Sequence, residues 1–348
     1  MRAHVTVVEA DLEFKHEQMA TAAFPFLRAT FYRWMQLWPL ECPDLASAPH
    51  VLAVGDLHIE NFGTWRDDEG RLVWGVNDFD EAYPLPYTID LVRLATSVRL
   101  AIGIGRLRLS PRRACAAILA GYRGTLQRGG RPFVLAEEHE VLRREATSEL
   151  RSPVAFWQRM DALPAVANPS PEAAELLRSR LSKDVTGVVF VSRRAGLGSL
   201  GHPRIVAKGV HHGGQIAREA KALLPSACAW ASPPSGSVAI HYQTIVRRAV
   251  RNPDPFLSVS GDWVMRRLAP DCSRIDFIAA HTKAEQEELM HAMGSETAHV
   301  HLGADPSRIR DVEHDLETRP EDWLRSASRA MAKATGRDFD SWRHREQD

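Results

Sequence analysis

Two acidic motifs near the start of the chain carry the residue types that phosphoryl transfer requires. Residues 55–63 read Gly-Asp-Leu-His-Ile-Glu-Asn-Phe-Gly, which places Asp56 and Asn61 five positions apart. A carboxylate can orient an acceptor hydroxyl, and an amide oxygen can bind the Mg²⁺ that neutralises the phosphates. An Asp followed by an Asn at this spacing is the arrangement of kinase catalytic loops. The motif therefore predicts a catalytic Asp56 and a metal-binding Asn61.

The second motif supplies carboxylates that the first lacks. Residues 76–81 read Val-Asn-Asp-Phe-Asp-Glu. Asp78 follows an apolar segment and precedes Phe79, like the metal-binding Asp at the end of a short strand in kinases. Asp80 and Glu81 add carboxylates that either reach a second metal ion or face solvent. A hairpin-like segment joins the two motifs, so we expect Asn61, Asp78 and Asp80 to converge on one metal site.

Each motif alone also has a plainer interpretation, as a turn whose carboxylate accepts hydrogen bonds from backbone amides. His58 is more typical of a hydrogen-bonded structural histidine than of a metal ligand. The combination is more specific than its parts, because two strand-like segments each end in an acidic loop of the same character. It predicts a metal or phosphate site.

A glycine run lies much later in the chain, between two strand-like segments. Residues 196–201 read Gly-Leu-Gly-Ser-Leu-Gly, so that Gly196, Gly198 and Gly201 form a Gly-x-Gly-x-x-Gly pattern. Without side chains, backbone amides can approach phosphate oxygens closely. Pro203 argues against the helix that a dinucleotide site would need at this point. The run predicts a hairpin over the phosphates of ATP, with an ordinary glycine turn as the alternative.

A lysine on a neighbouring strand should hold those phosphates. Lys208 follows the glycines too closely for an intervening strand and turn, whereas Lys221 leaves room for both, so we favour Lys221. Kinases pair this lysine with a glutamate on the next helix, but no Glu occurs between Lys221 and Glu285. Either Gln243 is the partner of Lys221 or it has none, and Glu219 would be the partner of Lys208.

Short strands and buried helices must position these motifs. In the N-terminal half we expect a helical segment over 12–38, with a break or helix start at Pro25, and then strands at 51–54 and 71–76 with a turn at 66–70 between them. One helix should begin after Thr88 as its N-cap, and another at Ser110-Pro111. Helical pattern continues up to residue 182.

The second half is richer in strand patterns. We expect strands at 185–191, 204–210 and 261–268 and a turn at 211–214, while the segment at 215–224 suits either a helix or a third strand. A loop at 230–237 and a helix at 238–250 lie between them. From residue 282 onward the pattern is helical, with helix starts near Pro306 and Pro320.

Composition excludes several classes of protein. The 348 residues are 44% hydrophobic and 25% charged, which is ordinary for a globular protein. Lys plus Arg equals Asp plus Glu, at 44 each, so no basic field indicates nucleic acid. The four cysteines lack metal-ligand spacing and read as reduced thiols. No signal peptide and no apolar run of membrane-spanning length is found. We expect a cytoplasmic protein with a small-molecule substrate and neither nucleic-acid nor membrane partners, with its oligomeric state open.

The two acidic motifs resemble the signature of a bacterial family catalogued as domain of unknown function 2252. The likeness extends over most of the chain, through residues 15–19, 26–34, 55–63, 77–82, 90–95, 196–201, 218–222 and 263–268. That family is grouped with the protein-kinase-like and aminoglycoside-phosphotransferase-like folds. The resemblance therefore implies this fold and nucleotide chemistry, but no particular substrate.

The order of the motifs differs from that of ordinary kinases, because the acidic loops precede the glycine run. The residues before these loops are too few to form a nucleotide lobe. We therefore expect an α+β, two-lobe, protein-kinase-like fold that is circularly permuted. Residues 1–182 would form the large lobe with the catalytic and metal loops, 183–270 the small nucleotide lobe, and 271–348 a helical return to the large lobe.

The expected function is an ATP- and Mg²⁺-dependent phosphotransferase that acts on a small-molecule hydroxyl. Asp56 would orient the acceptor, while Asn61, Asp78 and Asp80 would hold Mg²⁺. The glycine run and Lys221 would hold the phosphates. Two alternatives stay open: a non-catalytic nucleotide-binding pseudokinase, which the missing glutamate favours, and a nucleotidyl transferase that moves AMP on the same kind of fold.

Overall fold

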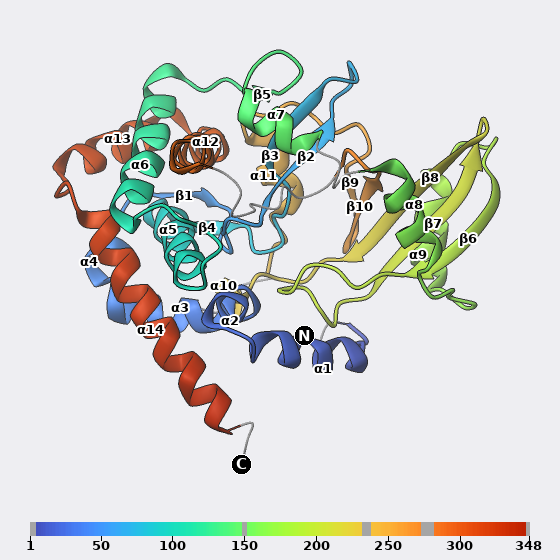
Figure 1. Cartoon of the computed structure of the whole chain (residues 1–348), viewed down its shortest axis with the longest axis horizontal. Helices are drawn as coiled ribbons and strands as arrows, with labels where there is room; N and C mark the ends of the chain where they lie inside the picture. The colour runs from blue at the N-terminus through green and yellow to red at the C-terminus, as the bar shows by residue number, and fades with distance from the viewer. Residues whose placement is uncertain (1–4, 148–151, 232–237, 273–281, 346–348) are drawn as a thin grey trace.

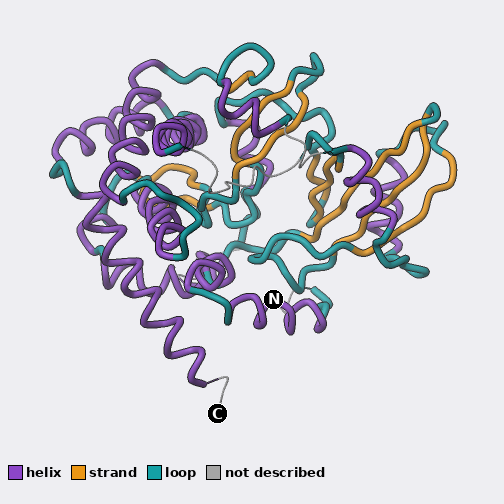
Figure 2. The backbone as a smooth tube through the Cα atoms, in the orientation of Figure 1, coloured by secondary structure: helices purple, strands orange, loops and turns teal. Residues whose placement is uncertain are grey.

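The chain folds into a mostly helical part and a five-stranded antiparallel sheet, which lie on opposite sides of the molecule (Figures 1 and 2). The computed structural model describes residues 5–147, 152–231, 238–272 and 282–345, and the fold is given for these ranges. The mixed α+β class expected from the sequence is confirmed. Within the described residues, no helix has both the length and the apolar character that a bilayer span requires.

The chain begins with a run of short helices. These are α1 (Glu9–Met19), α2 (Ala23–Ala29), α3 (Phe31–Glu41) and α4 (Pro43–Ala46). The single helical segment expected over 12–38 is therefore divided into three. The break or helix start expected at Pro25 lies two residues earlier, because α2 begins at Ala23. Pro25 is in the first turn of α2, where its missing N–H has no intrahelical partner to lose.

Two small antiparallel sheets follow. Strand β1 (His50–Ala53) pairs with β4 (Tyr83–Pro86), and β3 (Leu72–Val76) pairs with both β2 (Phe62–Arg66) and β5 (Phe133–Val134). The strands expected near 51–54 and 71–76 are confirmed. Strand β2 was not expected from the sequence. The polar stretch at 66–70 therefore joins β2 to β3 in a hairpin, and not β1 to β3 as expected.

Long helices build the main core around these sheets. They are α5 (Thr88–Gly103), α6 (Pro111–Arg128), α12 (Lys283–His301), α13 (Pro306–Thr318) and α14 (Trp323–Arg345). Helix α14 packs along α5 and α3, and α12 crosses α6, so the last helices join the first ones in one core. Ser110 caps α6 as expected, since its Oγ accepts the N–H of Arg113. Thr88 does not cap α5. It is the first helical residue, and its hydroxyl donates to the Leu45 carbonyl.

The five-stranded sheet has the order β6-β7-β8-β10-β9. Its strands are β6 (Thr186–Ser192), β7 (Arg204–His211), β8 (Gly214–Ala222), β9 (Ser258–Ser260) and β10 (Trp263–Leu268). The ambiguous segment at 215–224 is therefore a strand, which pairs with β7 on one side and with β10 on the other. Short α7 (Glu140–Ala146) precedes the sheet, and α11 (Tyr242–Arg248) is shorter than expected. Trp230 belongs to α10 (Ala227–Ala231), while residues 232–237 of the expected loop lie outside the described residues.

Two helices cover parts of the five-stranded sheet on its opposite faces. Helix α9 (Pro171–Ser179) packs Ala173 and Leu177 on the face that carries Phe190 and Met265. Helix α8 (Pro153–Asp161) covers the other face only in part, where Met160 packs among apolar side chains. The remainder of that second face is polar and turns toward the helical part of the molecule.

The α6–α12 crossing brings two backbones into contact. A Cβ added at Gly121 of α6 would lie 2.0 Å from the carbonyl oxygen of His291, and one at Gly294 of α12 would lie 2.0 Å from that of Ile118. Neither distance leaves room for a methyl group, and neither obstacle is a flexible side chain. Glycine at both positions is therefore a packing requirement, which outweighs its cost in helix propensity.

Gly121→Ala should consequently lower the free energy of unfolding, by at least about 2 kcal/mol, because the methyl group forces the two helices apart. Urea denaturation followed by circular dichroism would measure the loss. Gly336→Ala in α14 is the matched control, since nothing lies within 4 Å of its added Cβ. That control should gain up to about 1 kcal/mol from the better helix propensity of alanine. If Gly121→Ala were as stable as Gly336→Ala, the close approach of α6 and α12 would be contradicted.

Candidate functional site

The β2–β3 hairpin brings the two acidic motifs together. Phe62 and Val76 are register partners at the open end of the hairpin, and beyond them the Asn77 N–H donates to the Asn61 carbonyl oxygen at 2.9 Å. The loop that holds Asp56 and the loop that holds Asp78 therefore leave the same end of one hairpin. The two loops therefore meet as expected, while the metal site that Asn61, Asp78 and Asp80 would form stays a prediction.

Gly55 lets the two loops approach each other. Its φ is +83°, in the left-handed region that favours glycine. A Cβ at this position would lie 2.4 Å from the carbonyl oxygen of Glu81 in the second loop. Any other residue would therefore push the two loops apart.

Helix α5 holds the backbone of the first loop through Asp90. Its carboxylate accepts the N–H groups of Val54 at 2.7 Å and Gly55 at 2.9 Å. His301 Nε2 lies 3.0 Å from the same carboxylate, which assigns the ring proton to Nε2 and leaves Nδ1 to accept from the Tyr122 hydroxyl at 2.7 Å. Asp90 begins the segment 90–95 that carries part of the family likeness, whereas Tyr122 and His301 lie in no recognisable motif, and no role was expected for any of the three.

The side chain of Asp56 is held by Arg93, one turn further along α5. Arg93 Nε donates to Asp56 Oδ1 at 2.7 Å, and Nη2 contacts the same oxygen. The guanidinium lies 4.9 Å from the ring centre of Phe31 and 4.8 Å from that of Trp34, and it has no exposed surface. Arg93 is therefore a structural partner of Asp56.

Burial raises the pKa of the Asp56 carboxyl to about 6. The charge of Arg93 opposes this shift, and the negative charge of Asp78 adds to it. Asp56 is thus ionised at neutral pH but takes up a proton within a mildly acidic range.

Asn61 is oriented within its own loop. Its Oδ1 accepts the His58 N–H at 2.6 Å, and His58 Nδ1 accepts the Glu60 N–H at 3.1 Å. His58 thus makes the hydrogen bonds expected of a structural histidine, and it also lines the cleft described below. Asn61 is buried at the edge of the cleft described below, with its side-chain position fixed by the loop backbone.

The second loop meets a lysine from the five-stranded sheet. Lys221 Nζ donates to Asp80 Oδ2 at 2.6 Å and lies 3.4 Å from Asp78 Oδ1. Burial, together with the neighbouring charge of Asp78, raises the pKa of Asp80 to about 6. Burial also acts on Asp78, but the positive charges of Lys221 and nearby arginines overcome it and hold the Asp78 pKa below its usual value. Asp80 Oδ1 is buried and has no hydrogen-bond partner.

These contacts correct the expected partner of Lys221. Gln243 is exposed on α11, and the partners of Lys221 are two aspartates from the metal loop instead. Lys208 points elsewhere, since its Nζ donates to Asp161 at 2.8 Å. The preference for Lys221 over Lys208 as the lysine at the acidic loops is therefore supported by the geometry.

Glu219 forms the centre of an arginine cluster and pairs with neither lysine. Its buried carboxylate accepts hydrogen bonds from Arg193 at 2.7 Å, Arg204 at 2.8 Å and Arg266 at 2.8 Å. Burial acts to raise the Glu219 pKa, but the three guanidinium groups hold it well below the usual value. The cluster places a net positive charge on the sheet face that carries Lys221, two residues further along β8.

Helix α12 anchors the start of the second loop. Glu296 Oε1 accepts the N–H of Val76 at 2.9 Å, and Arg251 Nη1 donates to the carbonyl oxygen of the same residue at 3.0 Å. Gly75 makes room for this contact, because its Cβ would lie 2.2 Å from the Glu296 carboxylate. An acidic residue on the buried side of a long helix was the one signal in the sequence that could have revealed this anchor.

The glycine run lies in the connection between β6 and β7, as expected. Gly196 and Gly201 have φ values of +73° and +94°, which favour glycine. A Cβ on Gly198 would lie 3.1 Å from the Arg28 carbonyl oxygen and 3.4 Å from Asp56 Oδ2. The loop therefore passes directly beside Asp56, and its middle glycine permits that approach.

The loop is fixed to the helical part of the molecule, in contrast to a free hairpin. Leu197 and Leu200 are buried in a cluster that includes Phe26 of α2 and Phe339 of α14. The Val8 N–H also donates to the Gly201 carbonyl oxygen at 3.1 Å. The expectation of a simple hairpin over the phosphates missed this anchoring, because the leucines read only as spacers between glycines.

Lys15 of α1 completes this contact. Its Nζ donates to the Gly198 carbonyl oxygen at 2.9 Å. Burial lowers the pKa of Lys15 to about 8, although the negative charges of Asp56 and Glu81 act in the opposite direction. A cation from the N-terminal helix therefore lies beneath the glycine loop, close to both acidic loops.

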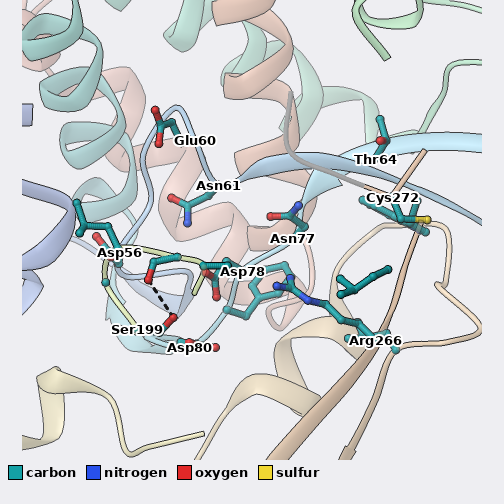
Figure 3. Close-up of a pocket in the computed structure, with 18 of the residues that line it drawn as sticks. Asp56, Glu60, Asn61, Thr64, Asn77, Asp78, Asp80, Ser199, Arg266 and Cys272 are labelled. Atoms are coloured by element: carbon teal, nitrogen blue, oxygen red, sulfur yellow. Dashed lines mark hydrogen bonds between the residues drawn. The ribbon is translucent and has the colours of Figure 1, made fainter. Parts of the chain in front are cut away.

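All these elements surround one cleft of about 540 Å³ (Figure 3). The residues named from the sequence that line it are Asp56, Asn61, Asp78, Asp80, Gly196 and Gly198. Lys221 lies behind the two aspartates and Gly201 faces Val8, so neither lines the open volume. Residues that the sequence analysis did not select also line it, among them Asn77, Ser199, Arg193, Arg266 and Cys272.

Asp56→Ala should lower the free energy of unfolding by about 3–5 kcal/mol, because it leaves the buried guanidinium of Arg93 without its counter-charge. Asp78→Ala is the matched control, since Lys221 keeps Asp80 as a partner and the Asp78 side chain is 33% exposed. Chemical denaturation of both variants at pH 7.5 would compare the losses. A loss for Asp56→Ala no greater than that for Asp78→Ala would contradict the structural role of the Asp56–Arg93 pair.

Among known proteins, the chain matches one family, over about its N-terminal half. No curated protein and no solved structure matches the chain. The resemblance of the two acidic motifs to a bacterial family is confirmed, while that of the later segments, with the glycine run and Lys221, stays a prediction. Over residues 7–174, which include Asp56, Asn61, Asp78 and Asp80, the chain is similar to the family described as "Uncharacterized protein conserved in bacteria (DUF2252)".

Proposed function

We propose that the protein is an ATP- and Mg²⁺-dependent phosphotransferase that acts on a small-molecule hydroxyl, on a circularly permuted protein-kinase-like fold. One observation carries the proposal. Lys221 extends from the five-stranded sheet to within 2.6 Å of Asp80 and 3.4 Å of Asp78, and these two aspartates line one cleft with Asp56 and Asn61. Phosphoryl transfer from ATP needs a strand lysine for the phosphates and carboxylates for Mg²⁺ close to each other, and both kinds of residue meet here.

The acidic loops fit a Mg²⁺ ion. Mg²⁺ is usually bound by one or two carboxylates together with phosphate oxygens and waters. Asp78 and Asp80 provide two carboxylates, and the buried Asp80 Oδ1 has a free acceptor position that a cation would satisfy. Asn61 would supply its amide oxygen. The bound ion would neutralise the charge of the phosphates, and Lys221, which now neutralises the aspartates, would be available to the phosphates as well.

Asp56 is suited to orient the acceptor. Both contacts from Arg93 use Oδ1, so Oδ2, on the side of the glycine loop, is the oxygen that would accept a proton from the substrate hydroxyl. Because burial raises its pKa to about 6, Asp56 is a stronger base than an exposed aspartate and is still ionised at neutral pH.

The missing glutamate gives weaker support to a pseudokinase than the sequence alone indicated. That glutamate normally positions the phosphate-binding lysine. In this chain Lys221 is only 3% exposed and is held by Asp80, so its position does not depend on a helix glutamate. The proposal therefore keeps a catalytic role.

Transfer of AMP is the second candidate, and the arginine cluster favours it. Arg193 and Arg266 line the cleft, whereas Lys221 lies behind the two aspartates, so the sheet presents more positive charge than one phosphate-binding lysine requires. ATP labelled at the α- or γ-phosphate separates the two reactions. Label from the γ-position on a small product supports phosphotransfer, whereas label from the α-position on a protein supports AMP transfer.

Lys221→Met should weaken Mg–ATP binding by at least about tenfold, because a phosphate contact is lost together with its charge. Asp78→Ala should abolish the Mg²⁺-dependent part of binding. Isothermal titration calorimetry with ATP, with and without Mg²⁺, would measure both effects. Lys208→Met is the matched control, since Lys208 pairs with Asp161 outside the cleft, and it should bind like the unmodified chain. Unchanged binding by the Lys221 and Asp78 variants would refute the nucleotide site.

The rate of phosphoryl transfer should fall about tenfold for each pH unit below about 6, because protonated Asp56 cannot accept the hydroxyl proton. The sign follows from the raised pKa: the ionised, active form is present above about 6 and is lost as pH decreases through that value. Mg²⁺-dependent ATP turnover between pH 4.5 and 8 would measure it, with far-ultraviolet circular dichroism at each pH to verify folding. An acid limb centred near 4, the ordinary value for aspartate, would argue against Asp56 as the base.

A further inference from the structure

The tip of the β7–β8 hairpin carries an unusual pair of adjacent histidines. His211 is the register partner of Gly214, so His212 and Gly213 form a two-residue turn, with φ values of +48° and +80°. Both values are positive, as in a type I′ turn, whose first central position favours Asn, Asp or Gly. The turn geometry alone therefore does not account for a histidine at position 212.

A third polar side chain is brought to this tip from the segment before β6. The β6–β7 pairing is irregular between Thr186 and Val189, and a Cβ on Gly209 would lie 2.6 Å from Val185 Cγ1. The chain before β6 is thus pressed against the end of β7, and Asp184 lies beside the two histidines.

The three side chains can hold one ion. One ligand atom from each of Asp184, His211 and His212 lies within 4.8 Å of the other two, and this is the one such group of His, Cys, Asp or Glu found in the described part of the chain. Ligands on a tetrahedral ion with 2.0–2.2 Å bonds are about 3.4 Å apart. Asp184 and His212 are exposed and His211 is half-buried, so small rotations of the side chains can bridge the difference.

We propose that Asp184, His211 and His212 form a surface site for a divalent transition-metal ion, with Zn²⁺ as the ion that fits best. Two imidazole nitrogens and one carboxylate oxygen are preferred ligands of Zn²⁺, and a water completes a four-coordinate ion. Mg²⁺ and Ca²⁺ prefer oxygen ligands alone and do not suit this group. The site is independent of the proposed phosphotransferase function, since none of its residues lines the cleft.

The bound ion would connect the start of the edge strand β6 to the turn of the β7–β8 hairpin beside it. Asp184 precedes β6, which is the outermost strand, whereas the histidines lie at the β7–β8 turn. Coordination would hold the start of β6 against that turn. A ligand that binds only the folded chain raises its apparent stability by mass action.

Calorimetric titration of the full chain with ZnCl₂, without a polyhistidine tag, tests the site. We expect one Zn²⁺ per chain and a rise in the thermal unfolding midpoint at saturating Zn²⁺, with no such rise for the same concentration of Mg²⁺. Amides of β6 should exchange with deuterium more slowly when Zn²⁺ is bound. Absence of stoichiometric binding at micromolar to millimolar Zn²⁺ would overturn the proposal.

The decisive variant is His212→Asn, because it removes a ligand and leaves an Asn-Gly turn, which suits this backbone better than His-Gly. It should fold at least as well as the unmodified chain but lose at least about tenfold in Zn²⁺ affinity. Asp184→Asn and His211→Thr should weaken binding in the same way. His314→Asn is the matched control, because His314 is an exposed histidine of α13 far along the chain from the group. Full affinity in the His212 variant, or an equal loss in the His314 variant, would place the Zn²⁺ elsewhere and refute the site.

Discussion

One turn of helix α5 determines where the first acidic loop lies. Asp90 accepts the two backbone N–H groups at the point where the chain leaves β1, and Arg93, one turn later, holds the side chain of Asp56. Both side chains are fully buried, so their charges are tolerable only while these partners stay in place. The position of the loop and the packing of α5 in the core therefore depend on each other.

Opposite charges join the sheet to the helical part. Asp78 and Asp80 come from the end of a hairpin in the core, and Lys221 comes from the middle of the five-stranded sheet. Glu219 neutralises only part of the arginine charge on the same face, which leaves that side of the cleft positive and the opposite side negative. Such a distribution attracts a ligand that combines an anionic group with a cation.

Local sequence patterns predicted the parts of the site that lie in continuous motifs. The loops around Asp56 and Asp78 were recognisable because a strand pattern, a glycine and a carboxylate follow one another within a few residues. The anchors were not recognisable, because Asp90, Arg93 and Glu296 act on loops far away in sequence, and only the packing of α5 and α12 brings them there. Within 12–38 a break or helix start was expected at Pro25, but the second break, at Thr30, was missed for a related reason, since tertiary contacts fix where the chain turns.

The anchoring of the glycine loop restricts the route by which ligands enter. Leu197 and Leu200 bind the loop to helices from both ends of the described chain, and Lys15 fastens its middle. A loop held in this way cannot swing open like a lid. A ligand of the cleft would therefore meet other lining residues as it enters, and these include Arg159 of α8 and Cys272 beyond β10.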